Sequence, residues 1–132
     1  MTVLFVFLAF TIIMGIILYV NVRANKPRQD FVVALHGIFA GISLGALTYA
    51  GADYIGQSNL LFNFSFMLFW IGGFLGVFML MKDKLFSKGI PTWLAGFPAG
   101  KGGIPKMLPL VHAGIQLVAL VLLILFVIQS GL

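Results

Sequence analysis

The stretch Phe31–Ala52, FVVALHGIFAGISLGALTYAGA, is long and apolar enough to cross a lipid bilayer, and it carries a histidine, His36, near its beginning. An ionisable side chain inside a membrane span is costly, and by default it marks a functional site. The only other histidine, His112, lies at a corresponding place in another apolar stretch. The first question is therefore whether these two imidazole side chains lie close together in the folded protein.

The composition of the whole chain agrees with a membrane location for this stretch. The chain has 132 residues, of which 61% are hydrophobic and 8% are charged, and its mean hydropathy is +1.14. Soluble domains contain about 25% charged residues, and a chain this short cannot bury so much apolar surface in one soluble core. These numbers predict an integral membrane protein. Cysteine is absent, which excludes disulfides, thiolate metal sites and thiol catalysis.

Four apolar runs are long enough to span a bilayer. Lipid satisfies no backbone hydrogen bonds, so each run must be a helix or a strand of a closed barrel, and barrel strands are about half as long. The sequence thus predicts an all-α integral membrane protein, in which residues 1–132 form a single transmembrane domain. The predicted bundle has four helices, and we expect them at about 2–20, 31–52, 60–81 and 108–128.

The connections between these runs predict the orientation. All eight basic residues lie in the first connection or in the long third one, 82–107, and the second has none: they are Arg23, Lys26, Arg28, Lys82, Lys84, Lys88, Lys101 and Lys106. The positive-inside rule then places those two connections in the cytoplasm and both termini on the non-cytoplasmic side. We expect the bacterial inner membrane. Since topology accounts for the basic residues, no nucleic-acid partner is predicted.

The two histidines are predicted to lie at similar depth on parallel helices, which allows them to face each other across the bundle. A weak internal repeat accompanies them, because LHGIFAGISLGAL around His36 aligns with VHAGIQLVALVLL around His112. Neutral imidazole is a common metal ligand, and haem iron accepts axial nitrogens. A flat macrocycle needs small residues beside each ligand, and such residues follow both histidines. The candidate lining is Gly37, Ala40, Ser43, Ala113 and the polar Gln116.

On His36 in LHGIFAG, His112 in VHAGIQL and the four-span layout, the chain resembles the small four-helix membrane cytochromes of b type. That resemblance implies one haem b, with its iron between the two histidines, and electron transfer with a quinone, a flavoprotein or a partner subunit. Many of those cytochromes hold two haems with four histidines, whereas this chain can supply ligands for only one. Arg28 and Lys106 are available on the cytoplasmic side to pair the haem propionates.

Other functions remain open at this point. The histidines could simply fasten helices through hydrogen bonds, or could serve a metal, proton or substrate role, although no acid or cysteine lies within the spans to complete a ligand set or relay. The chain could also be a small channel or transport protein, or a non-catalytic accessory subunit. No nucleophile–base pair or phosphate loop is present, so any enzymatic role is that of an oxidoreductase or electron-transfer subunit.

Glycines recur at every fourth position of the second span, at Gly37, Gly41 and Gly45. Small residues at this spacing let two membrane helices approach closely. The series predicts either packing inside the bundle or a homo-oligomer formed through this face.

Overall fold

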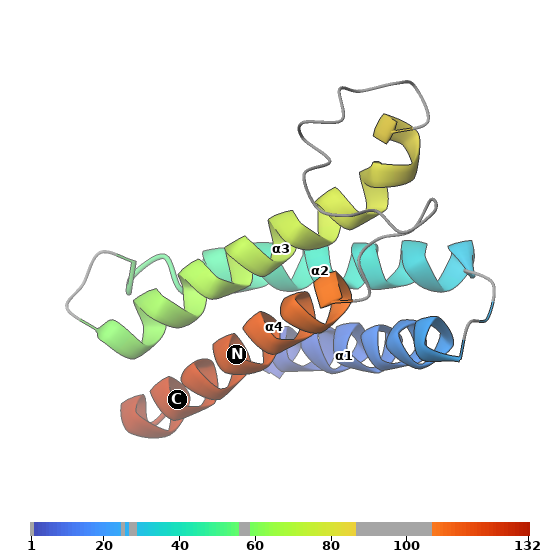
Figure 1. Ribbon diagram of the computed structural model, residues 1–132. Coiled ribbons are helices and arrows are strands. Elements are labelled where there is room, and N and C mark those ends of the chain that lie inside the picture. Colours follow the sequence, from blue (N-terminus) through green and yellow to red (C-terminus); the bar gives the residue numbers. More distant parts are fainter. Residues whose placement is uncertain (1, 25, 27–28, 56–58, 87–106) are drawn as a thin grey trace.

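The computed structural model describes residues 2–24, 26, 29–55, 59–86 and 107–132, which form four helices (Figure 1). All four are long and apolar enough to cross a membrane, as the sequence predicted. Their bounds are α1 Thr2–Arg23, α2 Asp30–Ala50, α3 Leu60–Phe86 and α4 Met107–Ser130.

The helix ends differ from the predicted spans by a few residues. Helix α2 ends at Ala50 rather than at residue 52, because Gly51 caps it and a turn follows. Helix α3 continues to Phe86, although residues 82–86 were assigned to the following connection. Charged residues mark where a helix can leave the apolar layer, but they do not end the helix itself, which continues in water or among headgroups. The rest of that predicted connection lies outside the described residues.

The four helices form two antiparallel hairpins. Helix α1 packs along α2 and α3 packs along α4, and α2 contacts α3 less extensively than either hairpin packs within itself. Leu44 of α2 lies in that contact, where it reaches the space beside Gly73. Both termini lie toward one end of the bundle, here called the terminal end, and the connection between α1 and α2 lies at the other (Figure 1).

The core is concentrated at the terminal end and is rich in aromatic rings. Phe62 and Phe126 are fully buried with ring centroids 5.1 Å apart, and Tyr54 meets Phe126 edge to face at 5.1 Å. Such tilted and edge-to-face pairs are favourable arrangements for aromatic rings. Leucines Leu4, Leu8, Leu47 and Leu123 complete the buried cluster together with Phe69 and Ala119.

The outer surface of the bundle is apolar on every helix. Exposed side chains include Ile13 on α1, Ile38 on α2, Phe74 on α3 and Leu117 on α4. A soluble protein rarely exposes apolar surface this extensive, whereas lipid solvates it at no cost. The arrangement of side chains therefore agrees with the composition, and the chain is treated below as an integral membrane protein.

Candidate functional site

His36 lies on the face of α2 that packs against α1. Its Nδ1 is 3.0 Å from the carbonyl oxygen of Thr11. A carbonyl oxygen only accepts hydrogen bonds, so this contact assigns the ring proton to Nδ1. In the neutral imidazole, Nε2 then carries a free lone pair, which is the form that binds metals.

His112 repeats this arrangement in the second hairpin. Its Nδ1 is 2.9 Å from the carbonyl oxygen of Gly72 on α3, so here too the proton lies on Nδ1 and Nε2 keeps its lone pair. Hydrogen bonding of one ring nitrogen to a backbone carbonyl is how proteins commonly fix the tautomer and orientation of a metal-binding histidine.

A glycine lies beside each imidazole. A Cβ atom added at Gly15 would come within 3.2 Å of Cε1 of His36, and one added at Gly76 would come within 3.3 Å of Cε1 of His112. Both distances are shorter than ordinary van der Waals contact. Each glycine also lies one helical turn beyond the residue whose carbonyl accepts the histidine proton. Each histidine therefore lies against a backbone carbonyl and a glycine of its partner helix, and the two arrangements match.

The two imidazole rings lie close together, edge to face, where the two hairpins meet. Their centroids are 6.3 Å apart and their planes meet at 76°. The prediction that parallel helices would bring the histidines together is therefore confirmed. The meeting joins the two hairpins, since α2 supplies one ring and α4 the other.

The match between the hairpins extends beyond the histidines, and it strengthens the weak repeat seen in the sequence. Four pairs of positions that correspond when the two histidines and their carbonyl partners are aligned are buried in both halves, whereas others, such as Gly72 and Thr11, differ in burial. The buried pairs are Leu4 with Ser65, Leu8 with Phe69, Ser43 with Ala119, and Leu47 with Leu123. The two hairpins thus share part of their burial pattern, and the imidazoles lie where the hairpins meet.

The other residues predicted for the site divide into three groups. Gln116 lies close to it, where its amide covers Gly72 and its Nε2 lies 3.4 Å from the carbonyl oxygen of Phe69. Gly37 and Ala40 are half-buried, whereas Ala113 is exposed on α4. Arg28 and Lys106, the predicted partners of propionates, lie outside the described residues.

Ser43, also predicted for the site, is buried between α1 and α2. Its hydroxyl donates to the carbonyl oxygen of Phe39 at 2.8 Å, and the Thr11 hydroxyl donates to that of Phe7 at 2.9 Å. The two hydroxyl oxygens are 3.5 Å apart. Since each hydroxyl has a single proton and donates it within its own helix, this contact adds little to the hairpin.

The sequence did not single out Thr11 or Gly15. No pattern in the sequence marks them, because the packing of α1 against α2, which brings both residues to His36, is visible only in the structure.

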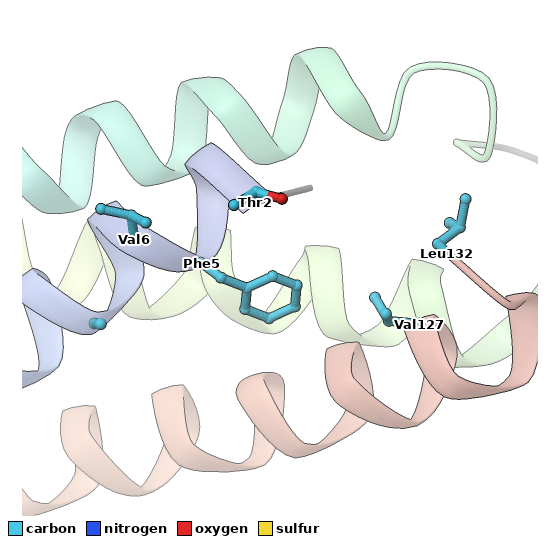
Figure 2. A pocket seen from close by; sticks show the side chains of 6 residues that line it. Thr2, Phe5, Val6, Val127 and Leu132 are labelled. Carbon is cyan, nitrogen blue, oxygen red and sulfur yellow. The ribbon is translucent and has the colours of Figure 1, made fainter.

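Two other features lie away from the histidines. Gly41 and Gly45 of the predicted oligomer face are exposed, with open space where a Cβ would stand. A shallow apolar groove of about 490 Å³ lies at the terminal end between α1 and α4 (Figure 2). Its lining comprises Thr2, Phe5, Val6, Ala9, Val127 and Leu132, none of which was predicted for the site.

The donor set at the histidines limits which metals fit. Among the described residues, no three His, Cys, Asp or Glu side chains gather closely enough to hold a metal ion. A zinc ion needs at least three protein ligands, so the two imidazoles alone do not fit it. They do fit an iron ion that already has four ligands from a macrocycle and needs two axial nitrogens.

Comparisons with protein-family models, with curated proteins and with solved structures find no match for this chain.

Proposed function

We propose that this protein is a small b-type cytochrome that binds one haem between His36 and His112. The observation that carries the proposal is the facing pair of imidazoles. Each ring comes from a different hairpin, each is held through Nδ1 by a backbone carbonyl, and each keeps the Nε2 lone pair for a ligand.

The spacing of the rings supports the proposal. A metal–imidazole bond of about 2.0 Å places the ring centre about 3 Å from the metal, so two rings on opposite sides of one ion stand about 6 Å apart. The observed centroid distance is 6.3 Å.

The chain's own residues have defined tasks in this proposal. The carbonyls of Thr11 and Gly72 orient the rings and, by accepting the Nδ1 proton, increase the basicity of Nε2. The absence of a side chain at Gly15 and Gly76 gives each imidazole room at Cε1. Haem, when bound, supplies a one-electron iron couple.

The proposed electron partners follow from the location of the site. A quinone reaches it through the lipid, and a partner subunit or flavoprotein reaches it from the surface. We further propose that the histidines lie nearer the cytoplasmic face, with both termini outside. The support is that Arg23, the last residue of α1, and Lys26, just beyond it, are exposed at the end of α1 nearer the histidines.

The same hydrogen bonds favour a second candidate, in which the protein is an accessory subunit without a cofactor. Each histidine already joins two helices through a carbonyl, which is a structural role that needs no metal. In that case each imidazole only holds the two helices of its hairpin together. Its removal would lower the free energy of unfolding and would not change the visible spectrum.

The visible spectrum of the protein, purified in detergent after expression with ample haem, separates the two candidates. The cytochrome is expected to show the bands of six-coordinate low-spin haem. His36→Ala and His112→Ala should each remove the low-spin character, because each leaves at most one axial nitrogen. A well-folded wild-type protein without a Soret band would contradict the cytochrome and support the second candidate, in which the histidines only join helices.

Matched glycine variants provide the control for these spectra. Gly41→Ala on α2 and Gly114→Ala on α4 add a methyl group where nothing lies within 4 Å, so the haem spectrum should not change. Gly15→Ala and Gly76→Ala add the same group against an imidazole and should weaken the low-spin bands. Equal effects at all four glycines would show that the methyl groups act on general packing rather than on the histidines.

A further inference from the structure

We infer that the two axial ligands are unequal, with His112 the permanent ligand of the haem and His36 the ligand that a small neutral molecule displaces. This inference rests on the proposed haem and adds to it a ligand-binding position on the His36 side. The class of ligand is the diatomic gases that bind ferrous haem, for which carbon monoxide is the probe.

The first support is the hydrogen bonding around each histidine. In the second hairpin, Ser65 donates to the carbonyl oxygen of Ala119 at 2.8 Å, and Gln116 donates to that of Phe69 at 3.4 Å. These bonds join α3 to α4 at the two turns that follow the bond from His112 to Gly72, on the side toward the terminal end. The helix segment that carries His112 is therefore held against α3 at several successive turns.

The first hairpin lacks the donors at the matching positions. Leu4 occupies the position that corresponds to Ser65, and Ala40 the one that corresponds to Gln116. Neither side chain can donate a hydrogen bond. The hydroxyls of Thr11 and Ser43, which do lie between α1 and α2, donate within their own helices. The two hairpins therefore correspond at these positions, but only the second has side chains there that donate hydrogen bonds between its helices.

The surroundings of the two acceptor carbonyls differ in the same direction. Each carbonyl belongs to a residue one turn from a buried side chain, Phe69 for Gly72 and Leu8 for Thr11. Gly72 is buried beneath the Gln116 amide, however, whereas Thr11 is half-buried. A ring whose acceptor belongs to a less packed helix moves away at lower cost. We therefore expect the His36–iron bond to open first.

Haem retention by the single variants tests which ligand is permanent. His36→Ala is expected to retain five-coordinate haem through His112. His112→Ala is expected to retain roughly five- to tenfold less haem than His36→Ala, which is the factor that two interhelical hydrogen bonds of average strength supply. Added imidazole should restore the low-spin spectrum of His36→Ala, because it enters the space beside Gly15. Equal retention by the two variants, or greater retention by His112→Ala, would overturn the inference while leaving the cytochrome intact.

Carbon monoxide titration tests the exchange in full-length protein with both histidines present. The reduced wild-type protein should bind carbon monoxide, and Gly15→Ala, which crowds His36, should bind it about tenfold more tightly because a modest clash weakens the ligand being displaced. Gly76→Ala crowds His112 by nearly the same amount and should not raise this affinity. No carbon monoxide adduct in the wild-type protein, or the larger increase in Gly76→Ala, would overturn the inference.

These outcomes are distinct from failure of the proposed function. A wild-type protein that binds no haem under any loading condition would contradict the proposed cytochrome function, and the inference about unequal ligands would fail with it. Because the glycine variants keep both histidines, they also decide the matter if His112→Ala fails to fold.

Discussion

The two hairpins have the same plan and are held together by different forces. Each places one histidine against a backbone carbonyl and a glycine of its partner helix. The second hairpin adds interhelical bonds from Ser65 and Gln116 and contributes the buried rings Phe62, Phe69 and Phe126. The first has leucine and alanine at the positions matching those two donors. Two similar hairpins can therefore hold a histidine in matching positions while the contacts that support it differ.

The largest effect on stability is expected where the second hairpin exceeds the first, in its aromatic core. Phe126→Ala removes a fully buried ring that contacts Phe62 and Tyr54. Lipid is as apolar as the ring, so the transfer component is small in a membrane. The cavity that remains costs about 2 kcal/mol, at roughly 24 cal/mol per Å³ for about 100 Å³.

Unfolding in detergent, followed by helical circular dichroism, measures this cost. Phe74→Ala on α3 is the matched control, because its ring is 67% exposed and faces outward. A loss of stability as large for Phe74→Ala as for Phe126→Ala would contradict the location of the core at the terminal end.

A smaller and equal effect is expected at the matching leucines of the two hairpins. Leu47 is 1% exposed and Leu123 is 0% exposed, at corresponding positions of α2 and α4. If the hairpins are true structural repeats, Leu47→Ala and Leu123→Ala each leave a similar cavity and cost roughly 1–2 kcal/mol, again without a large transfer component. Their unfolding free energies, measured in the same detergent, should agree within about 0.5 kcal/mol, the usual error of additivity between such sites.

The smallest effect is expected from a single polar cross-link. Ser65→Ala removes the bond to the Ala119 carbonyl and should cost about 0.6 kcal/mol, the average for interhelical side-chain bonds in membranes. Thr48→Ala is the control, because the Thr48 hydroxyl bonds to Leu44 of its own helix. We expect Thr48→Ala to be nearly neutral, and a neutral Ser65→Ala would remove the energetic difference between the hairpins.

Much of the fold could be predicted from the sequence because lipid allows few alternatives. Four apolar runs of the length of Phe31–Ala52 must form helices, since no other open structure satisfies the backbone in a bilayer. The place of each histidine within its run then predicted similar depth, and the rings of His36 and His112 do meet. The helix ends were less accurate, as the continuation of α3 to Phe86 shows, because charge reports the membrane boundary rather than the end of the helix.

The surroundings of the histidines could be predicted only in part. Gln116 was identified as a candidate for the lining, whereas Thr11 and Gly15 were not. A threonine in an apolar span has no pattern that sets it apart, and its role here is carried by a backbone carbonyl, which every residue possesses. The exposed Ala113 illustrates the same difficulty, because it is adjacent to His112 in sequence yet points away from the hairpin partner.

The sequence by itself determined the four helices, each long and apolar enough to cross a membrane, because composition and length are sufficient for these. The tertiary structure decided which helices form hairpins, which carbonyl holds each imidazole proton, and that Gly15 and Gly76 lie against the rings. The physical reason is that helices apolar on all sides carry no hydrophobic stripe to set their rotation. Their facing surfaces are chosen by close packing and by a few hydrogen bonds, which depend on both partners at once.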